Sequence, residues 1–231
     1  MRAKKYMKHM KPGGWSEVRA EDRVPARQTV PQEEPKLELG DDSTVAAYTA
    51  FRDQIYNPKS VLYPSCGFDA SPSRVFGNVT FVDKDGDNQG YIRKFQEAGF
   101  QAFKQDIRLY RPAQRHDLLI LMNPYIPTDW ATPYLKNGGY VLANNYHLNA
   151  SWLNTQKDRF SLIGIIDRDQ NAGSASITMN RDGELSKTVS IESIVESRPI
   201  EHKAFMDHKK IGRFSGLPFE REAYMYVFMK K

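Results

Sequence analysis

The sequence has little of several features on which whole classes of protein depend. Its 231 residues include one cysteine, Cys66, which excludes an intrachain disulfide and a zinc site built from several cysteines. No apolar run approaches the roughly 20 residues needed to cross a bilayer. The basic N-terminus lacks the apolar stretch of a secretory signal. We therefore expect a cytoplasmic protein with no membrane partner.

Signatures of several enzyme classes are also missing. His116 and His147 have no companion at the spacing of metal ligands, so we expect no metal site. The G-x-G-x-x-G pattern is absent after the first expected strand, which disfavours a nicotinamide-dependent oxidoreductase. No Ser-His-Asp or Cys-His arrangement stands out, and Cys66 is interpreted as a small buried apolar residue.

The composition is that of a globular chain with a poorly structured beginning. Hydrophobic residues make up 40% and charged residues 26%, and the net charge of +5 permits an anionic partner such as nucleic acid. Prolines and mixed charges interrupt the first part too often for long elements. We expect a flexible basic tail over residues 1–40 and one α/β domain over 41–231, with 167–220 as an insertion or substrate-side region. The oligomeric state stays open.

From residue 41 onward, strand-like apolar runs alternate with helical patterns. The run 117–122 is almost continuously apolar, as is typical of a strand buried on both faces of a parallel sheet. This alternation predicts a doubly wound α/β sheet. We expect helices at 41–56, 91–98, 130–135 and 151–159, and strands at 61–63, 79–83, 101–106, 117–122, 140–144, 160–166 and 224–229.

Three further segments carry local signals. Residues 137–139 (Asn-Gly-Gly) indicate a turn before the fifth strand. Residues 181–184 (Arg-Asp-Gly-Glu) indicate a hairpin turn between strands at 176–179 and 187–191. Residues 192–210 are expected to be helical in part.

The stretch from Val61 to Ser71 is the one around which the rest is arranged. An apolar run ends in a turn that contains Gly67, and Ser71 followed by Pro72 is the signal of a helix start with Ser71 as N-cap. In open α/β sheets, ligands bind at the carboxyl ends of the strands. The stretch therefore predicts a ligand crevice, although any α/β fold needs a turn at this place.

This order of elements resembles the S-adenosylmethionine (SAM)-dependent methyltransferases of the Rossmann-like class. The resemblance covers about residues 43–166 and the closing strand. It implies a mostly parallel, seven-stranded sheet with an antiparallel last strand, and SAM as the cofactor.

The resemblance also implies which residues bind the cofactor. The family places a glycine-rich turn beside the methionine part of SAM, and here Ser65 and Asp69 stand where that pattern has glycines, so only Gly67 matches. Asp69 is the candidate for the cofactor's ammonium group, and Asp83 the candidate for the ribose hydroxyls. The implied cofactor-binding residues are Ser65, Gly67, Asp69, Asp83, Asp106 and Ile107, the last two beside the adenine.

The fourth expected strand ends in Asn123-Pro124-Tyr125, which resembles the Asn/Asp-Pro-Pro-Tyr/Phe motif of enzymes that methylate amino nitrogens. Tyr125 stands where the second proline belongs. The resemblance implies a catalytic role for these three residues and an amino nitrogen of a nucleic acid or protein as acceptor. A methyltransferase-like binding module without catalysis, contacting nucleic acid through its basic tail or surface, is the alternative that the incomplete glycine turn favours.

Overall fold

The computed structural model describes residues 36–84, 90–189 and 217–231. The chain divides by its contacts into Met1–Glu34 and Pro35–Lys231, and every element described here belongs to the second unit. That unit begins before residue 41, because the Glu38 amide donates to the Phe68 carbonyl at 2.8 Å and the Ala70 amide donates to the Glu38 carbonyl at 2.7 Å. The expected helix at 192–210 and most of the expected tail lie outside the described residues.

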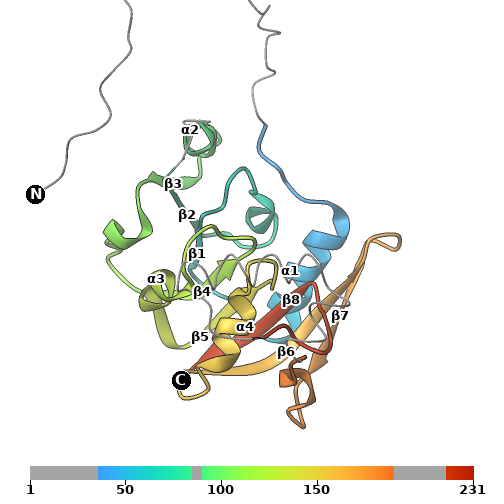
Figure 1. Ribbon diagram of the computed structural model, residues 1–231. Coiled ribbons are helices and arrows are strands. Elements are labelled where there is room, and N and C mark those ends of the chain that lie inside the picture. The colour runs from blue at the N-terminus through green and yellow to red at the C-terminus, as the bar shows by residue number, and fades with distance from the viewer. Residues whose placement is uncertain (1–35, 85–89, 190–216) are drawn as a thin grey trace, which may run out of the picture. The chain divides into compact units, whose positions relative to one another are not determined.

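The described residues form one eight-stranded sheet in the order β3-β2-β1-β4-β5-β8-β6-β7 (Figure 1). β1 to β5 pair in parallel, and β8 lies antiparallel between β5 and β6. This topology confirms the Rossmann-like methyltransferase fold, with β7 as an additional edge strand. The strands are β1 (Val61–Pro64), β2 (Val79–Asp83), β3 (Gln101–Lys104), β4 (His116–Leu121), β5 (Leu135–Ala143), β6 (Phe160–Asp169), β7 (Ser174–Met179) and β8 (Met225–Lys230).

Helices cover both faces of the sheet because successive strand residues point to opposite sides. In β4, Leu118 and Ile120 belong to the core on one face, with Phe51 of α1, whereas Leu119 and Leu121 belong to the core on the other. The Asp41 carboxylate caps α1 by accepting from the Thr44 amide at 2.7 Å. The helical segments are α1 (Asp42–Gln54), η2 (Ser71–Arg74), α2 (Tyr91–Glu97), η4 (Ile107–Leu109), α3 (Thr128–Ala131), η5 (Thr132–Tyr134), α4 (Asn149–Thr155) and η6 (Glu184–Ser186), where η marks a 3-10 turn.

Two local predictions in the first half of the domain are wrong. Ser71 is the first residue of the short 3-10 turn η2 rather than an N-cap, because its neighbour Ala70 takes the cap position and makes no side-chain cap bond. Residues 137–139 lie inside β5, which begins at Leu135 and shifts register against β4 between His116 and Leu118.

The predicted hairpin around residues 181–184 is also wrong. β7 pairs with β6, and the turn between them lies at 170–173, where the Asp169 carboxylate accepts from the Asn171 and Ala172 amides. Gly173 supplies a φ of +60° in the same turn. Residues 187–189 instead contact the segment before β8, through a bridge between Thr188 and Phe219. No helix among the described residues is both long and apolar enough to cross a membrane.

The order of connections fixes where the sheet can hold a ligand. From β1 the chain moves outward to β2 and β3 and then returns to β4 on the other side of β1. The loops that follow β1 and β4 therefore leave in opposite directions, and a crevice opens between them at the carboxyl ends of the strands.

Candidate functional site

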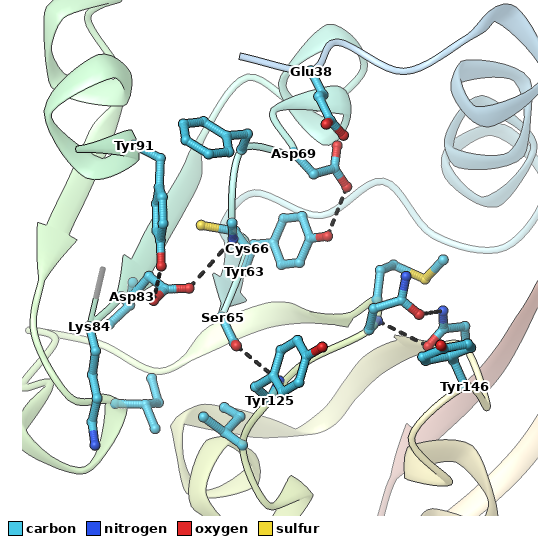
Figure 2. Close-up of a pocket in the computed structure, with 18 of the residues that line it drawn as sticks. Glu38, Tyr63, Ser65, Cys66, Asp69, Asp83, Lys84, Tyr91, Tyr125 and Tyr146 are labelled. Carbon is cyan, nitrogen blue, oxygen red and sulfur yellow. Dashed lines mark hydrogen bonds between the residues drawn. The ribbon is translucent and has the colours of Figure 1, made fainter. Parts of the chain in front are cut away.

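A cavity of about 930 Å³ lies at this switch point, and Figure 2 shows the residues around it. Its walls come from the residues that follow β1, β2, β3, β4 and β5, with Glu38, Arg168 and Tyr224 at one end. Of the residues predicted from the sequence, the cavity is lined by Ser65, Gly67, Asp69, Asp83, Ile107, Asn123 and Tyr125. Asp106 and Pro124 are not among the lining residues.

The turn after β1 contains two residues in the left-handed region of backbone space. Gly67 has a φ of +56°, and a Cβ added to it would meet no atom within 4 Å. Ser65 has a φ of +54° although it carries a side chain, and its amide donates to the Val82 carbonyl at 2.9 Å. Ser65 therefore adopts the conformation of the glycine that the family pattern has at this place, at an energetic cost that glycine avoids.

The Asp83 carboxylate at the tip of β2 is held in position from two sides (Figure 2). The hydroxyl of the buried Tyr91 donates to Oδ1 at 2.9 Å, and the Gly67 amide lies 3.5 Å from Oδ2. An ionised carboxylate accepts from several donors at once, because its two oxygens have about four lone-pair positions. Asp83 thus offers an oriented acceptor beside the glycine turn.

The Asp106-Ile107 pair is divided by the structure. The Asp106 carboxylate lies 2.6 Å from the Arg108 guanidinium and 2.7 Å from Lys84 Nζ. Hydrogen bonds from Arg108, followed by the bond from Lys84, hold the pKa of Asp106 well below its usual range despite the cost of burial. Ile107 is 3% exposed and lines the cavity. The apolar member of the pair therefore faces the candidate site, and the acid forms ion pairs beside it.

Two carboxylates, Glu38 and Asp69, lie at the opposite end of the cavity and face one another in Figure 2. The Tyr63 hydroxyl donates to Asp69 Oδ2 at 2.8 Å, and the Ser71 amide donates to Oδ1 at 2.8 Å. Burial and the Asp69 charge raise the pKa of Tyr63 well above its usual value, so Tyr63 stays a donor. Among the residues that the structure describes, no cation forms an ion pair with Glu38 or Asp69.

Arg168 of β6 brings a positive charge to the same end. Its guanidinium lies 4.0 Å from the centre of the Tyr224 ring, and its NH1 group donates to Thr44 Oγ1 at 2.8 Å. Asp41 is 3.6 Å away. Glu38, Arg168 and Tyr224 were not predicted from the sequence, since each comes from a segment far from the motifs in the chain.

The loop after β4 forms the remaining wall. Asn123 has a φ of +50°, and its amide donates to Asn144 Oδ1 at 3.0 Å while Asn144 Nδ2 donates back to Asn123 Oδ1. Tyr125 is 85% exposed, with its ring centre 4.9 Å from that of His147. The ring of Tyr146 lies 4.7 Å from the same histidine. This end of the site therefore combines amide groups with three adjacent rings.

Cys66, predicted to be buried, is a buried cysteine outside any disulfide and lies in the wall of the cavity. Within 36–84, 90–189 and 217–231, no group of three or more histidine, cysteine, aspartate or glutamate residues is arranged to hold a metal ion.

No family model matches the chain, and no curated protein matches it. Among solved structures it is similar to the N-methyltransferase NodS from Bradyrhizobium japonicum WM9, at 14% identity over 44% of this chain and 64% of that chain, with a TM-score of 0.35. It is also similar to the plantazolicin methyltransferase BpumL in complex with SAH, at 13% identity over 83% of this chain and 82% of that chain, with a TM-score of 0.40. A third is SAM-bound CalS10, an amino pentose methyltransferase from Micromonospora echinaspora, at 12% identity over 45% of this chain and 50% of that chain, with a TM-score of 0.36.

The chain thus spans less than two thirds of the length of NodS and half that of CalS10. At these identities and scores, an assignment of function depends on the sheet topology and on the residues at its carboxyl rim.

Proposed function

We propose that the chain is a SAM-dependent methyltransferase that acts on an amino nitrogen. The observation that carries this proposal is the cavity at the β1–β4 switch point, with the open side of Gly67 and the carboxylate of Asp83 in its wall. Ligands of open α/β sheets bind at such switch points. The volume of about 930 Å³ lies in the range of small-molecule sites, roughly 300–1,000 Å³.

The adenosine part of the cofactor fits the side of the cavity formed by β2 and η4. Asp83 would accept hydrogen bonds from the ribose hydroxyls, because an ionised carboxylate only accepts and is already oriented by Tyr91. Ile107 would provide an apolar surface for the adenine. The missing Cβ of Gly67 leaves space in which a ligand can approach the backbone.

The amino-acid part of the cofactor carries an ammonium and a carboxylate, and the other end of the cavity offers the complementary charges. Glu38 and Asp69 would hold the ammonium, and Arg168 would attract the carboxylate. Two neighbouring carboxylates repel each other until a cation lies between them. In this arrangement Asp69 would bind the ammonium group, the role that the sequence suggested for it, and Glu38 would be a second carboxylate bound to the same group.

When bound, SAM supplies an electrophilic methyl group on its sulfonium. The chain's own residues have to orient the acceptor and exclude water, and no covalent nucleophile is needed. Asn123 Oδ1 and the Pro124 carbonyl would accept the hydrogens of an amine and so direct its lone pair. The rings of Tyr125 and Tyr146 at the mouth suit a flat acceptor.

A methyltransferase-like binding module without catalysis is the second candidate. Ser65 and Asp69 in place of glycines favour it, because side chains there restrict approach to the backbone. It shares the fold and cavity with the enzyme, so only ligand binding and methyl transfer distinguish the two. The net positive charge of the chain leaves nucleic acid as a partner in either case.

Calorimetric titration with SAM, S-adenosylhomocysteine (SAH), NAD and NADP tests the cofactor. We expect SAM and SAH alone to bind, and Asp83→Ala to weaken SAH binding by about tenfold or more, since hydrogen bonds to a charged group contribute about 1.5–3 kcal/mol. Asp182→Ala, which removes an exposed carboxylate outside the cavity wall, is the matched control. Binding of NAD alone, or an unchanged affinity in Asp83→Ala, would contradict the proposal.

Methyl transfer distinguishes the two candidates. With isotopically labelled SAM, the enzyme should transfer label to amines in nucleic acid or protein, whereas the binding module should bind SAM and transfer none.

A further inference from the structure

Ser65 occupies a position where a side chain is unfavourable. Its φ of +54° lies in the left-handed region, which glycine adopts freely and serine does not. The family pattern has a glycine at this place. When the fold holds a residue other than glycine in this strained backbone conformation, an interaction elsewhere compensates the energetic cost.

The serine hydroxyl makes such an interaction across the sheet. Ser65 Oγ accepts a hydrogen bond from the Tyr125 amide at 3.0 Å, and Figure 2 shows this bond joining the β1 turn to the loop after β4. The two residues are 60 positions apart in the chain. A glycine would relieve the backbone but could not make this bond.

We call residues 123–125 the acceptor loop. With the bond to Ser65, each backbone N–H group of this loop has an acceptor. The Asn123 amide donates to Asn144 Oδ1 of the loop after β5, and Pro124 has no amide hydrogen. The Tyr125 amide donates to Ser65. Every backbone donor of the acceptor loop is therefore satisfied by a side chain of a neighbouring strand end. The backbone of this loop therefore offers a ligand only its carbonyl oxygens, beside the side chains of Asn123 and Tyr125.

We propose that Ser65 is a positioning residue that couples the cofactor turn to the acceptor loop. Binding of the cofactor against the β1 turn would fix Ser65, and Ser65 would fix the Tyr125 amide and so the loop that presents the methyl acceptor. The serine is thus a functional replacement for glycine rather than a loss of the motif. This inference rests on the proposed function, because it requires a ligand at the β1 turn.

The test compares the wild-type chain with Ser65→Ala and Ser65→Gly. Ser65→Ala removes the hydroxyl and keeps the backbone strain, and Ser65→Gly removes both, so the second variant keeps the test valid if the first folds poorly. Thr155→Ala is the control, since it removes a hydroxyl that bonds the Trp152 carbonyl at 2.7 Å outside the site. Hydrogen exchange of the Tyr125 amide, followed by NMR with and without SAH, is the main measurement, and calorimetry gives the SAH affinity.

We expect the Tyr125 amide to exchange about fivefold faster in both Ser65 variants, the ratio that corresponds to the loss of one ordinary hydrogen bond. With each protein saturated with SAH, as calorimetry determines, the ligand should slow this exchange in the wild type and in Thr155→Ala but not in the Ser65 variants, because the lost bond is the link between the turn and the loop. A role confined to the structure of the turn would not make the response to SAH depend on the hydroxyl.

Two results would overturn the inference while leaving the proposed function standing. One is an unchanged Tyr125 exchange rate in both variants, and the other is an SAH response that persists without the hydroxyl. If calorimetry finds no SAH binding to the wild type, the proposed function fails, and the coupling falls with it for that separate and visible reason.

Discussion

Gly67 offers the sharpest perturbation of the candidate site. Replacing it with alanine adds one methyl group at a φ of +56°, in a direction where no protein atom lies within 4 Å. The change therefore causes no clash within the protein itself. It affects two separate quantities, the strain of the turn and the space available in the cavity.

The strain can be given a size. Placing a residue with a Cβ in the left-handed region costs about 1–2 kcal/mol. For a domain of this size that corresponds to a fall in Tm of about 2–8 °C, at roughly 2–4 °C per kcal/mol. The methyl group in the cavity should in addition cost a well-fitted ligand about 1–3 kcal/mol, as overpacking does in a core. SAH binding should therefore weaken by about fivefold to more than a hundredfold.

The control is Gly99→Ala. Gly99 has a φ of +82°, and an added Cβ there also meets no atom within 4 Å. It precedes β3 and so lies at the amino ends of the strands, away from the cavity at their carboxyl ends. Differential scanning calorimetry should give both variants a similar loss of Tm, and titration should show weakened SAH binding for Gly67→Ala alone. Equal SAH affinity in the two variants would refute the placement of the cofactor against Gly67.

Three further predictions concern stability and the acceptor. Burial lowers the pKa of His116 from an ordinary 6.5 to about 4. The stability that the neutral imidazole contributes is therefore complete above pH 6.5 and is lost as the pH falls towards 4, by up to about 3 kcal/mol. His116→Gln should remove this part of the pH dependence of Tm. Gly164→Ala would place its Cβ 2.6 Å from the Thr178 carbonyl oxygen in β7, and we expect it to cost about 1–3 kcal/mol in chemical denaturation. Tyr125→Ala should leave SAH affinity and Tm nearly unchanged, because the residue is 85% exposed, but should slow transfer to the acceptor.

Each of these has a clear contrary result. A pH profile of Tm that is the same in wild type and His116→Gln would show that His116 is not held neutral in the fold. An unaltered denaturation midpoint for Gly164→Ala would mean that a small shift between β6 and β7 accommodates the methyl group without loss of stability. Undiminished methyl transfer by Tyr125→Ala would remove that ring from the acceptor site.

The sequence predicted those parts of the fold that depend on local pattern. The apolar runs of β1, β2 and β4 are buried on both faces, so their composition alone identified them. Gly67 and Asp83 follow directly after such runs, which is why their place at the carboxyl rim could be predicted.

Features that depend on distant contacts could not be predicted in this way. Asp106 forms ion pairs with Lys84 and Arg108, and the tertiary partner is more than twenty residues away in the chain. Glu38 lies in a proline-rich stretch whose sequence predicts no regular structure. In the fold its backbone forms a bridge with that of Asp69. The hairpin at 181–184 had a good turn signal, but β6 continues to Asp169 and takes β7 as its partner first.

The most direct test of the central claim is a crystal structure of the chain grown with SAH. We expect one SAH molecule in the cavity, with its ribose hydroxyls on the Asp83 carboxylate and its amino-acid end beside Glu38 and Asp69. Density for SAH at another surface, or a cavity filled by the chain's own side chains while SAH stays unbound, would contradict it.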